Sequence, residues 1–261
     1  MIELKNARIL LTGATGGLGQ ALAHELVAVE AKLLLAGRDA RRLAGIAASL
    51  HDCATVAADL TRPEGIAAAV DAARRFGVNV LVNNAGIGGF GLFDSQDWQT
   101  VEQLLATNLA APMHLTHALL PLLKGQPQAA VVNVGSTFGS LPFAGFAAYS
   151  AAKAGLRGFS QALRRELADT QVTVIYLAPR AIDTTLNTAA VNALNRALKN
   201  HSDSAEETAR RVGDALRRRS GERHFGFPER LFAWLNGVAP SLIDRGVAGK
   251  LAVIKRHALN P

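Results

Sequence analysis

The sequence predicts an α/β fold in which a doubly wound parallel sheet forms a single domain. Six short runs rich in Val, Ile, Leu and Ala alternate with longer helix-forming segments, without a linker, repeat or low-complexity tract between them. A glycine cluster between the first run and the first helix, and polar residues directly after several later runs, support the same fold. With 261 residues and 49% hydrophobic composition, the chain can bury one large core.

The first expected strand covers residues 8–12 and runs directly into the glycine turn Gly13–Gly19. Helix-forming residues follow from Gln20 to Ala28. Glycines let a pyrophosphate approach the backbone, and the first turn of the helix offers unpaired N–H groups to it. The order of strand, glycine turn and helix therefore favours a dinucleotide site over a merely structural turn.

The second expected strand, residues 32–36, ends in Gly37, Arg38 and Asp39. A carboxylate at this strand end would bind the ribose hydroxyls of NAD, whereas an arginine would pair with the 2′-phosphate of NADP. Arg38 therefore favours NADP(H) over NAD(H). Asp39 keeps NAD open, because a small shift in the turn would bring its carboxylate nearer the ribose.

The third and fourth expected strands cover residues 54–58 and 79–82, and a helix follows Pro63 between them. Asp59 directly follows the third strand. The stretch 96–123 is predicted to be mostly helical, and it holds Asn108 in an apolar context. The amide of Asn108 is either a satisfied packing group or part of a site, and both interpretations stay open.

The fifth expected strand, residues 129–134, places Ser136 just beyond its end, and the sixth covers residues 172–177. Ligands of open parallel sheets bind outside the carboxyl ends of the strands, which makes Ser136 a candidate site residue.

Tyr149 and Lys153 lie four residues apart in an alanine-rich run. If this run is helical, the two side chains share a face and the cation can stabilise the phenolate. Acid/base work near neutral pH requires about 4 kcal/mol of such stabilisation, because a free phenol titrates near pH 10. The alternative is an ordinary Tyr/Lys pair on the surface of an amphipathic helix.

The C-terminal part of the chain is basic. Residues 196–261 hold 13 Lys and Arg against 7 Asp and Glu, whereas residues 1–195 hold 15 and 14. A helix is predicted after Ser204, which forms a capping-box pattern with Glu207, and Pro228 and Pro240 each fit the first turn of a further helix. These last two helices carry apolar stripes with interleaved basic residues: Leu231, Phe232, Trp234, Leu235 and Val238, then Leu242, Ile243, Val247, Leu251 and Ile254. The stripes could pack on the sheet domain, on a second subunit or into a membrane interface, and we expect packing within the protein.

Composition narrows the remaining possibilities. Cys53 is the single cysteine, which rules out an internal disulfide and suits a reducing compartment. The first residues carry no apolar signal segment, and no run approaches eighteen apolar residues, so we expect a cytoplasmic protein without a membrane span. No metal site is predicted. The basic tail favours solvated helix faces over nucleic-acid binding.

With these residues assembled, the chain resembles the short-chain dehydrogenase/reductase family over roughly residues 5–226. Residues 12–19 match the glycine motif of that family, residues 83–86 match its sheet-stabilising motif, and Tyr149 with Lys153 matches its active-site motif. The resemblance implies a Rossmann-type catalytic domain over residues 1–226, with a substrate region at about 184–226. Residues 227–261 would be a basic, amphipathic helical extension of the same domain.

The resemblance also implies hydride transfer between a nicotinamide and a carbonyl or alcohol carbon. The implied catalytic residues are Asn108, Ser136, Tyr149 and Lys153. Tyr149 would exchange the proton, Lys153 would lower the pKa of Tyr149 and hold the nicotinamide ribose, and Ser136 would bind the substrate oxygen. Asn108 would position a water. The implied cofactor-binding residues are Thr12, Gly13, Thr15, Gly16, Gly17, Leu18, Gly19, Arg38, Asp59, Leu60, Asn84, Ala85, Gly86, Tyr149, Lys153, Pro179, Arg180, Ile182 and Thr184.

One residue departs from the family pattern. The family usually has Pro-Gly ahead of the threonine that corresponds to Thr184, and here Arg180 follows Pro179. We expect Arg180 either to touch cofactor phosphate or to turn outward to solvent.

Loop phenylalanines indicate an apolar substrate pocket, to which about half of the candidates would contribute. The candidates are Phe90, Leu92, Phe93, Phe138, Leu141, Phe143 and Phe146. The predicted function is NADP-dependent reduction of a lipophilic ketone or aldehyde by a homo-oligomer, a dimer or a tetramer. The alternatives are a 3-oxoacyl thioester reductase acting on acyl-carrier-protein or CoA substrates, and a non-catalytic dinucleotide-binding scaffold or sensor. The tail would serve as a lid, a subunit interface or a peripheral membrane contact.

Overall fold

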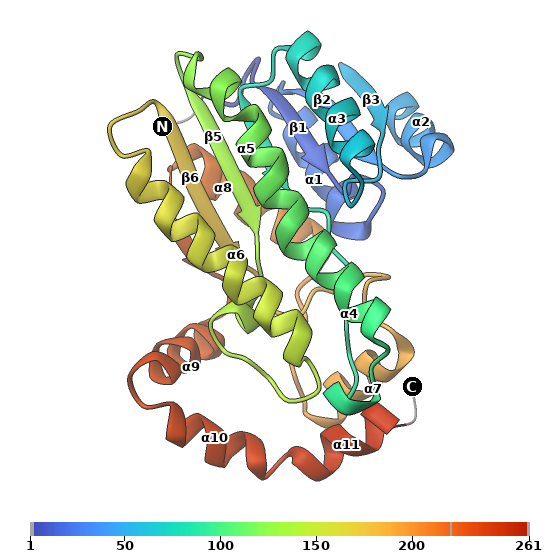
Figure 1. Ribbon diagram of the computed structural model, residues 1–261, viewed down its shortest axis with the longest axis vertical. Helices are drawn as coiled ribbons and strands as arrows, with labels where there is room; N and C mark the ends of the chain where they lie inside the picture. The colour runs from blue at the N-terminus through green and yellow to red at the C-terminus, as the bar shows by residue number, and fades with distance from the viewer. Residues whose placement is uncertain (1–2, 220, 260–261) are drawn as a thin grey trace.

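A computed structural model describes residues 3–219 and 221–259, and Figure 1 shows them as one sheet covered by helices. The strands are β1 (Arg8–Thr12), β2 (Lys32–Gly37), β3 (Cys53–Ala57), β4 (Val80–Asn83), β5 (Ala129–Val134), β6 (Val172–Ala178) and β7 (Glu222–His224). They form one sheet in the order β3-β2-β1-β4-β5-β6-β7, and every neighbouring pair is parallel. The predicted doubly wound parallel sheet is confirmed.

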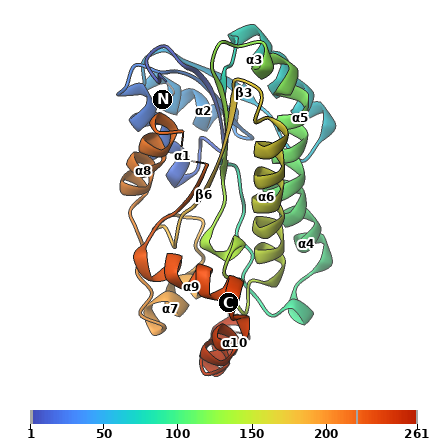
Figure 2. The same ribbon diagram turned by 90° about the vertical axis from the view of Figure 1, so that its left-hand side faces the viewer.

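Helices cover both faces of this sheet, as Figure 2 shows from the side. One layer comprises α1 (Gly17–Val27), α2 (Ala40–Ala48) and α8 (Ala205–Arg217), and the other comprises α3 (Pro63–Phe76), α5 (Ala111–Lys124) and α6 (Ala147–Glu166). Along β1, Ile9 and Leu11 belong to the first core and Leu10 to the second. Burial on both faces explains why these strands are continuous apolar runs.

The structure has a seventh strand where the sequence predicted six. Strand β7 is only three residues long and polar throughout, so it carries no apolar signal. It pairs with the end of β6, where Glu222 accepts hydrogen bonds from Arg157 at 2.7 Å and Gln161 at 2.8 Å. Together with a hydrogen bond to His224, which is the largest cause, these bonds lower the pKa of Glu222 to about 2. Partners on β7 itself and on α6 thus satisfy the Glu222 carboxylate, whereas His224 Nδ1 is buried without a hydrogen-bond partner.

The predicted helical stretch 96–123 is divided into three parts. Helix α4 (Trp98–Leu105) continues through a π-helical turn (Ala106–Ala110) into α5. Asn108 lies in the middle of the π turn, a local widening of the helix that recurs at functional sites.

The C-terminal tail contains three helices where two were predicted: α9 (Phe227–Val238), α10 (Pro240–Ala248) and α11 (Leu251–Leu259). The expectation that their stripes pack within the protein is wrong for most of the stripe residues. Ile254 is fully buried, but Leu231, Trp234 and Val238 are exposed. Helix α9 turns Asn236 toward the domain instead, and its Nδ2 donates to the carbonyl of Ser140 at 3.1 Å. Helix α7 (Ala189–Ala197) contacts α11.

None of the helices in the described part of the chain combines the length and apolarity that a membrane crossing requires. The capping box at Ser204 is half formed. The Ser204 hydroxyl accepts from Glu207 N at 3.0 Å, whereas the Glu207 carboxylate pairs with Arg211.

Candidate active site

The glycine turn joins the end of β1 to the start of α1. Gly13 has φ +64°, and a Cβ at this position would lie 2.7 Å from the Cα of Ala85, so both the conformation and the close approach require glycine. The cap residue of α1, Gly16, has no side chain to bond the first-turn N–H groups. Those groups are therefore available to an anion.

The turn after β4 is bonded directly to the glycine turn. The Thr12 hydroxyl donates to Val82 O at 3.2 Å and accepts from the N–H groups of Asn84 and Ala85, both at 3.0 Å. The Asn84 amide donates to Thr12 O at 3.0 Å. These bonds join the carboxyl ends of β1 and β4 at the point where the strand order reverses, which is the expected ligand position of this fold.

The end of β2 places Arg38 on the surface beside Asp59. One oxygen of the Asp39 carboxylate accepts from Arg42 N at 3.0 Å and caps α2. The Arg42 guanidinium crosses to the glycine turn and donates to Thr15 O at 3.0 Å. Arg38 and Asp39 are both exposed at this strand end, so a 2′-phosphate and a ribose contact both stay open.

Asp59 and Leu60 follow β3 at the same edge of the sheet. The Asp59 carboxylate accepts from the hydroxyl of Thr61 at 2.7 Å and from its N–H at 3.0 Å. These hydrogen bonds, with a smaller contribution from Arg38, lower the pKa of Asp59. Leu60 packs partly buried against the second core, so of the two only Asp59 offers a polar group.

Asn108 is completely buried, and both ends of its amide bond the backbone of Ile87. Its Oδ1 accepts from Ile87 N and its Nδ2 donates to Ile87 O, each at 2.8 Å. Both interpretations left open by the sequence therefore have support: the amide is satisfied, and it lies at the site. A Cβ on Gly86 would be 3.1 Å from Asn108 Oδ1 and 3.7 Å from Lys153 Nζ.

Ser136, after β5, lies close to Tyr149 on α6. Burial raises the pKa of Tyr149, and the nearby Ser136 hydroxyl acts in the opposite direction. Tyr149 lies in the first turn of α6, so the alanine-rich run is helical as the spacing required.

Lys153 lies one turn along α6, with its Nζ 5.8 Å from the centre of the Tyr149 ring. Its ammonium donates to Val134 O at 3.0 Å rather than to the phenol. Burial lowers the pKa of Lys153 to about 8. Lys153 lies on the same face of α6 as Tyr149. The lowering of the Tyr149 pKa by Lys153, which the resemblance implied, is absent in this arrangement.

Tyr176 is a residue behind the site, in contact with the backbone of Ser136, that the sequence did not indicate. Its ring is fully buried below β5, and Cβ atoms on Gly135 and Gly139 would lie 2.2 Å and 2.4 Å from its hydroxyl. The hydroxyl contacts the backbone of Ser136 and, at 3.4 Å, the carbonyl of Lys153. Tyr176 is one of only two tyrosines in the chain, and Gly135 and Gly139 face its hydroxyl in the structure. These residue types were the available signal.

The segment after β6 returns toward the glycine turn. Pro179 O accepts from Thr137 N at 2.9 Å, and Ile182 forms a bridge with Asp203. Thr184 reaches α1: a Cβ on Gly17 would lie 2.9 Å from its Cγ2. The sequence placed Thr184 near the cofactor, and the structure places it against the glycine turn.

Arg180 does not turn outward to solvent, which was one of the two expectations. Its guanidinium donates to the carboxylate of Asp203, which is 1% exposed, and lies 3.8 Å from Glu229. The hydrogen bond with Asp203 raises the pKa of Arg180. Arg180 thus joins the end of β6 to the segment before α8 and to the start of α9, and its contact with a cofactor stays a prediction.

Four of the seven apolar candidates surround Tyr149. Phe138 and Phe146 contact its ring edge-on, with centroids 6.2 and 6.3 Å away, and Phe90 and Phe143 complete the aromatic cluster. Ile254 of the tail is buried in the same cluster. Leu92 and Leu141 lie outside it, and Phe93 is 56% exposed. Four candidates thus pack together beside Tyr149, and their contribution to a substrate pocket stays a prediction.

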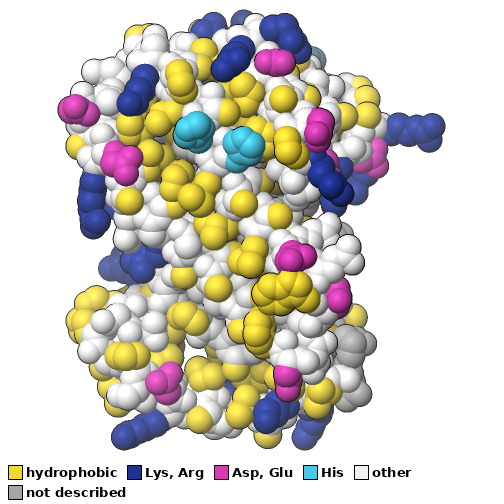
Figure 3. Space-filling model, viewed as in Figure 1, with side chains coloured by type: hydrophobic (Ala, Val, Ile, Leu, Met, Phe, Trp, Pro, Cys, Tyr) yellow, Lys and Arg dark blue, Asp and Glu magenta, His cyan; other side chains and the backbone are white. Residues whose placement is uncertain are grey.

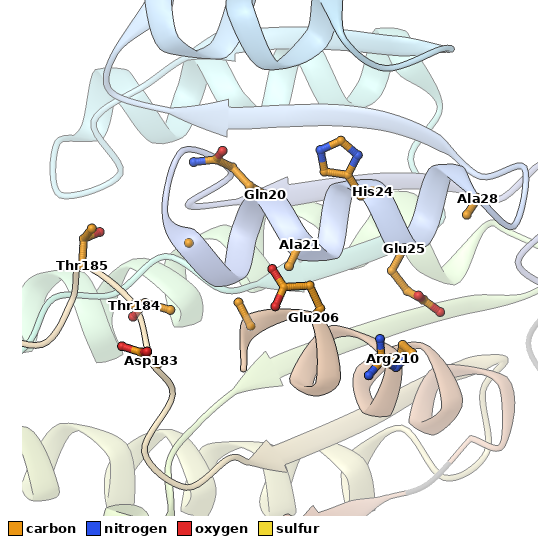
Figure 4. Close-up of a pocket in the computed structure, with 12 residues that line it drawn as sticks. Gln20, Ala21, His24, Glu25, Ala28, Asp183, Thr184, Thr185, Glu206 and Arg210 are labelled. Atoms are coloured by element: carbon orange, nitrogen blue, oxygen red, sulfur yellow. The ribbon is translucent and has the colours of Figure 1, made fainter. Parts of the chain in front are cut away.

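A cavity of about 670 Å³ lies between α1, α8 and the loop 183–185. Figure 4 shows Gln20 and His24 on α1, Glu206 and Arg210 on α8, and Thr184 on the loop. The cavity shares only Gly17 and Thr184 with the predicted cofactor residues, and the catalytic residues lie elsewhere. It is therefore a space behind the glycine turn and not the reaction site.

Comparison with known proteins identifies the group to which this geometry corresponds. The family model described as short chain dehydrogenase matches residues 7–195. Dehydrogenase/reductase SDR family member 7B of the mouse is 32% identical over 264 residues, which cover 95% of this chain and 82% of the relative. The 3-oxoacyl-[acyl-carrier-protein] reductase FabG of Vibrio cholerae is 33% identical over 231 residues, which cover 87% of this chain and 93% of the relative.

Two solved structures have the same fold. A short-chain dehydrogenase/reductase from Burkholderia phymatum in complex with NAD gives a TM-score of 0.83 at 24% identity, covering 93% of this chain and 96% of that one. A short chain dehydrogenase from Burkholderia cenocepacia in complex with NADP gives a TM-score of 0.74 at 30% identity. The match covers 85% of this chain and 96% of that one. The neighbours thus hold either nicotinamide dinucleotide.

Proposed function

The chain belongs to the short-chain dehydrogenase/reductase family, and from this premise we propose that it is an NADP-dependent reductase of lipophilic ketones or aldehydes. Members of the family are oxidoreductases that act on CH–OH or C=O groups with a nicotinamide dinucleotide. The observation that carries the proposal is the convergence of Ser136, Tyr149 and Lys153 at the sheet edge that holds the glycine turn.

The residues present fit a bound dinucleotide. The uncapped start of α1 would hold the pyrophosphate, the ionised Asp59 would face the adenine, and Arg38 would pair with a 2′-phosphate. When bound, the cofactor would supply the hydride that forms the new C–H bond at the carbonyl carbon.

The chain would supply the proton. The Tyr149 hydroxyl would transfer its proton to the carbonyl oxygen, and the Ser136 hydroxyl would donate a hydrogen bond to the same oxygen. Lys153, with a pKa of about 8, is mostly charged at neutral pH and would stabilise the phenolate that is left. Both groups of the Asn108 side-chain amide are hydrogen-bonded to the backbone of Ile87. Any water that Asn108 positions would therefore be held by the main chain of Asn108.

The aromatic cluster around Tyr149 supports a lipophilic substrate, since a sugar would leave its hydroxyls facing apolar rings there. A 3-oxoacyl thioester reductase is the second candidate, supported by the likeness to FabG of Vibrio cholerae. A non-catalytic sensor would have no need to retain Ser136, Tyr149 and Lys153 in one site.

The proposal is tested by following NADPH and NADH oxidation with a panel of aromatic and aliphatic ketones, aldehydes and acetoacetyl-CoA. We expect NADPH-dependent reduction of the lipophilic carbonyls, and Tyr149→Phe should lower kcat by roughly 10²–10⁴ while NADPH still binds. Full activity of Tyr149→Phe would refute the mechanism, and a preference for acetoacetyl-CoA would select the second candidate.

We also propose a homodimer or homotetramer in the cytoplasm. Figure 3 shows hydrophobic side chains gathered over α5 and α6, and Met113 on α5 is 40% exposed. Sedimentation analysis tests the assembly, and cell fractionation tests the location.

A further inference from the structure

The tail helices concentrate exposed apolar surface. In the described part of the chain, eight of the twelve large hydrophobic side chains that are exposed belong to α9, α10 and α11. They are Phe227, Leu231, Phe232, Trp234, Val238, Leu242, Leu251 and Leu259. So dense an apolar surface on a short segment indicates a contact with something outside the chain.

On α9 four of the five exposed large hydrophobic residues form a single stripe, and Phe232 lies apart from it. Phe227, Leu231, Trp234 and Val238 follow one another at intervals of four, three and four residues, which places them on one side of the helix. Their exposed fractions are 76%, 49%, 63% and 61%. A surface helix ordinarily turns such a stripe inward, but here the inward side holds Asn236. Within residues 3–219 and 221–259, therefore, nothing covers the stripe.

The tail is nevertheless fixed to the domain. Ile254 of α11 is fully buried against Phe146 and Leu194, and Asn236 bonds the loop after β5. Figure 1 shows α9, α10 and α11 following one another along the end of the molecule below the sheet. The unpartnered stripe thus belongs to a firmly placed surface.

The charge of this surface indicates which kind of partner it would bind. Residues 227–259 contain five basic side chains and two acidic ones, Glu229 and Asp244, and Glu229 is already near Arg180. Figure 3 shows basic side chains along the lower edge of the molecule, next to the hydrophobic ones over α9. A two-fold contact between two tails would bring these like charges together, whereas an anionic bilayer offers both apolar depth and negative charge.

We propose that α9, α10 and α11 form a binding surface for anionic lipid bilayers. The stripe of α9 enters the boundary between headgroups and acyl chains, with Trp234 at that level, and Arg230, Arg245, Lys250 and Lys255 pair with lipid phosphates. The helices lie in the plane of the surface. This inference goes beyond the catalytic proposal and does not depend on it.

The test is cosedimentation of the full chain with vesicles of phosphatidylcholine alone and of phosphatidylcholine mixed with phosphatidylglycerol. We expect binding to the mixed vesicles that is at least tenfold tighter and that weakens as salt rises from about 0.1 to 0.5 M. Trp98 and Trp234 are the only tryptophans, so Trp98→Phe leaves Trp234 as the single reporter. Its emission should shift to the blue on binding and be quenched by lipids brominated in their acyl chains.

Two tail variants separate the two contributions. Removing four charges (Arg230→Gln, Arg245→Gln, Lys250→Gln, Lys255→Gln) should abolish the preference for anionic lipid, and Leu231→Ser with Val238→Ser should weaken binding at least tenfold. A matched control removes four exposed charges elsewhere (Arg74→Gln, Arg75→Gln, Lys124→Gln, Arg165→Gln) and should bind as the parent does. Unchanged thermal unfolding verifies that each variant is folded.

Three results would overturn the proposal. The first is absence of binding to mixed vesicles, and the second is equal loss of binding in the control variant. The third is a protein that does not bind lipid and whose assembly size is halved by a tail variant. In that case a second copy of the chain would cover the stripe.

Discussion

The hydroxyl of Tyr176 is held against the backbone of Ser136, accepting from its N–H at 3.4 Å and donating to its carbonyl at 3.3 Å. The hydroxyl of the same serine accepts from Phe138 N at 3.2 Å and lies close to Tyr149. A buried phenol of β6 therefore positions the residue that would bind the substrate oxygen, and it does so without reaching the reaction site itself.

Tyr176→Phe should lower kcat by roughly tenfold, because even a small displacement of Ser136 misplaces its hydroxyl. It should also cost about 1 kcal/mol of stability through the lost hydrogen bonds. Thr208→Val is a matched control, since Thr208 is buried and its hydroxyl bonds Ser204 O far from the site. The control should lose about as much stability as Tyr176→Phe and keep its kcat. If both variants had the same kcat, Tyr176 would have a structural role alone.

Lys153 should make stability depend on pH in the cofactor-free protein. Its pKa is lowered from 10.5 to about 8, so between these values the unfolded chain binds more protons at this position than the folded chain. The free energy of unfolding should therefore rise with pH across that window, by about 3 kcal/mol at most. Urea unfolding at several pH values measures the rise.

The matched variants for this prediction are Lys153→Met and Lys124→Met. Lys124 is exposed, so its variant should keep the rise, whereas Lys153→Met should lack it. A rise of the same size in Lys153→Met would show that other groups cause it.

Arg180→Gly should destabilise the protein by about 3 kcal/mol, because it removes a partner of a buried carboxylate. Arg180→Lys should recover part of the loss, and adding Asp203→Asn to Arg180→Gly should cost less than the sum of the two single changes. Chemical denaturation measures each value. Dinucleotide affinity should stay constant throughout, and a selective loss of NADPH binding would place Arg180 in the cofactor site.

Substitutions of Arg38 and Asp39 should affect different properties: dinucleotide binding for Arg38 and stability for Asp39. Arg38→Gln should weaken NADPH binding by roughly ten- to hundredfold and leave NADH binding unchanged, because only NADP carries the 2′-phosphate. Asp39→Ala should lower stability by about 1 kcal/mol through loss of the α2 cap. Calorimetric titration and thermal unfolding distinguish the two, and weaker NADH binding by Asp39→Ala at unchanged stability would make Asp39 a ribose ligand.

The sequence predicted those parts of the fold that local patterns encode. The strand before Gly13 and the helix bearing Tyr149 and Lys153 follow from apolar runs, glycine placement and a spacing of four residues. Residues at strand ends then converge because parallel strands place their carboxyl ends at one edge.

The misses depend on contacts between distant residues. Arg180 is 23 positions from Asp203, and nothing local to either residue indicates their pairing. Strand β7 is three polar residues that become a strand only by pairing with β6. The apolar stripe of α9 is evident in the sequence, but its outward direction is set by Asn236 bonding a loop 96 residues away.

Burial of Ile254 beside the rings that surround Tyr149 has a consequence for inhibitor selectivity. The segment matched by the family model ends at residue 195, so this contact comes from a part of the chain beyond it. A compound that occupies the cluster and reaches Ile254 would engage a side chain that the matched segment does not provide. Such a compound would gain affinity from a contact outside the matched segment, and Ile254→Ala would measure that gain.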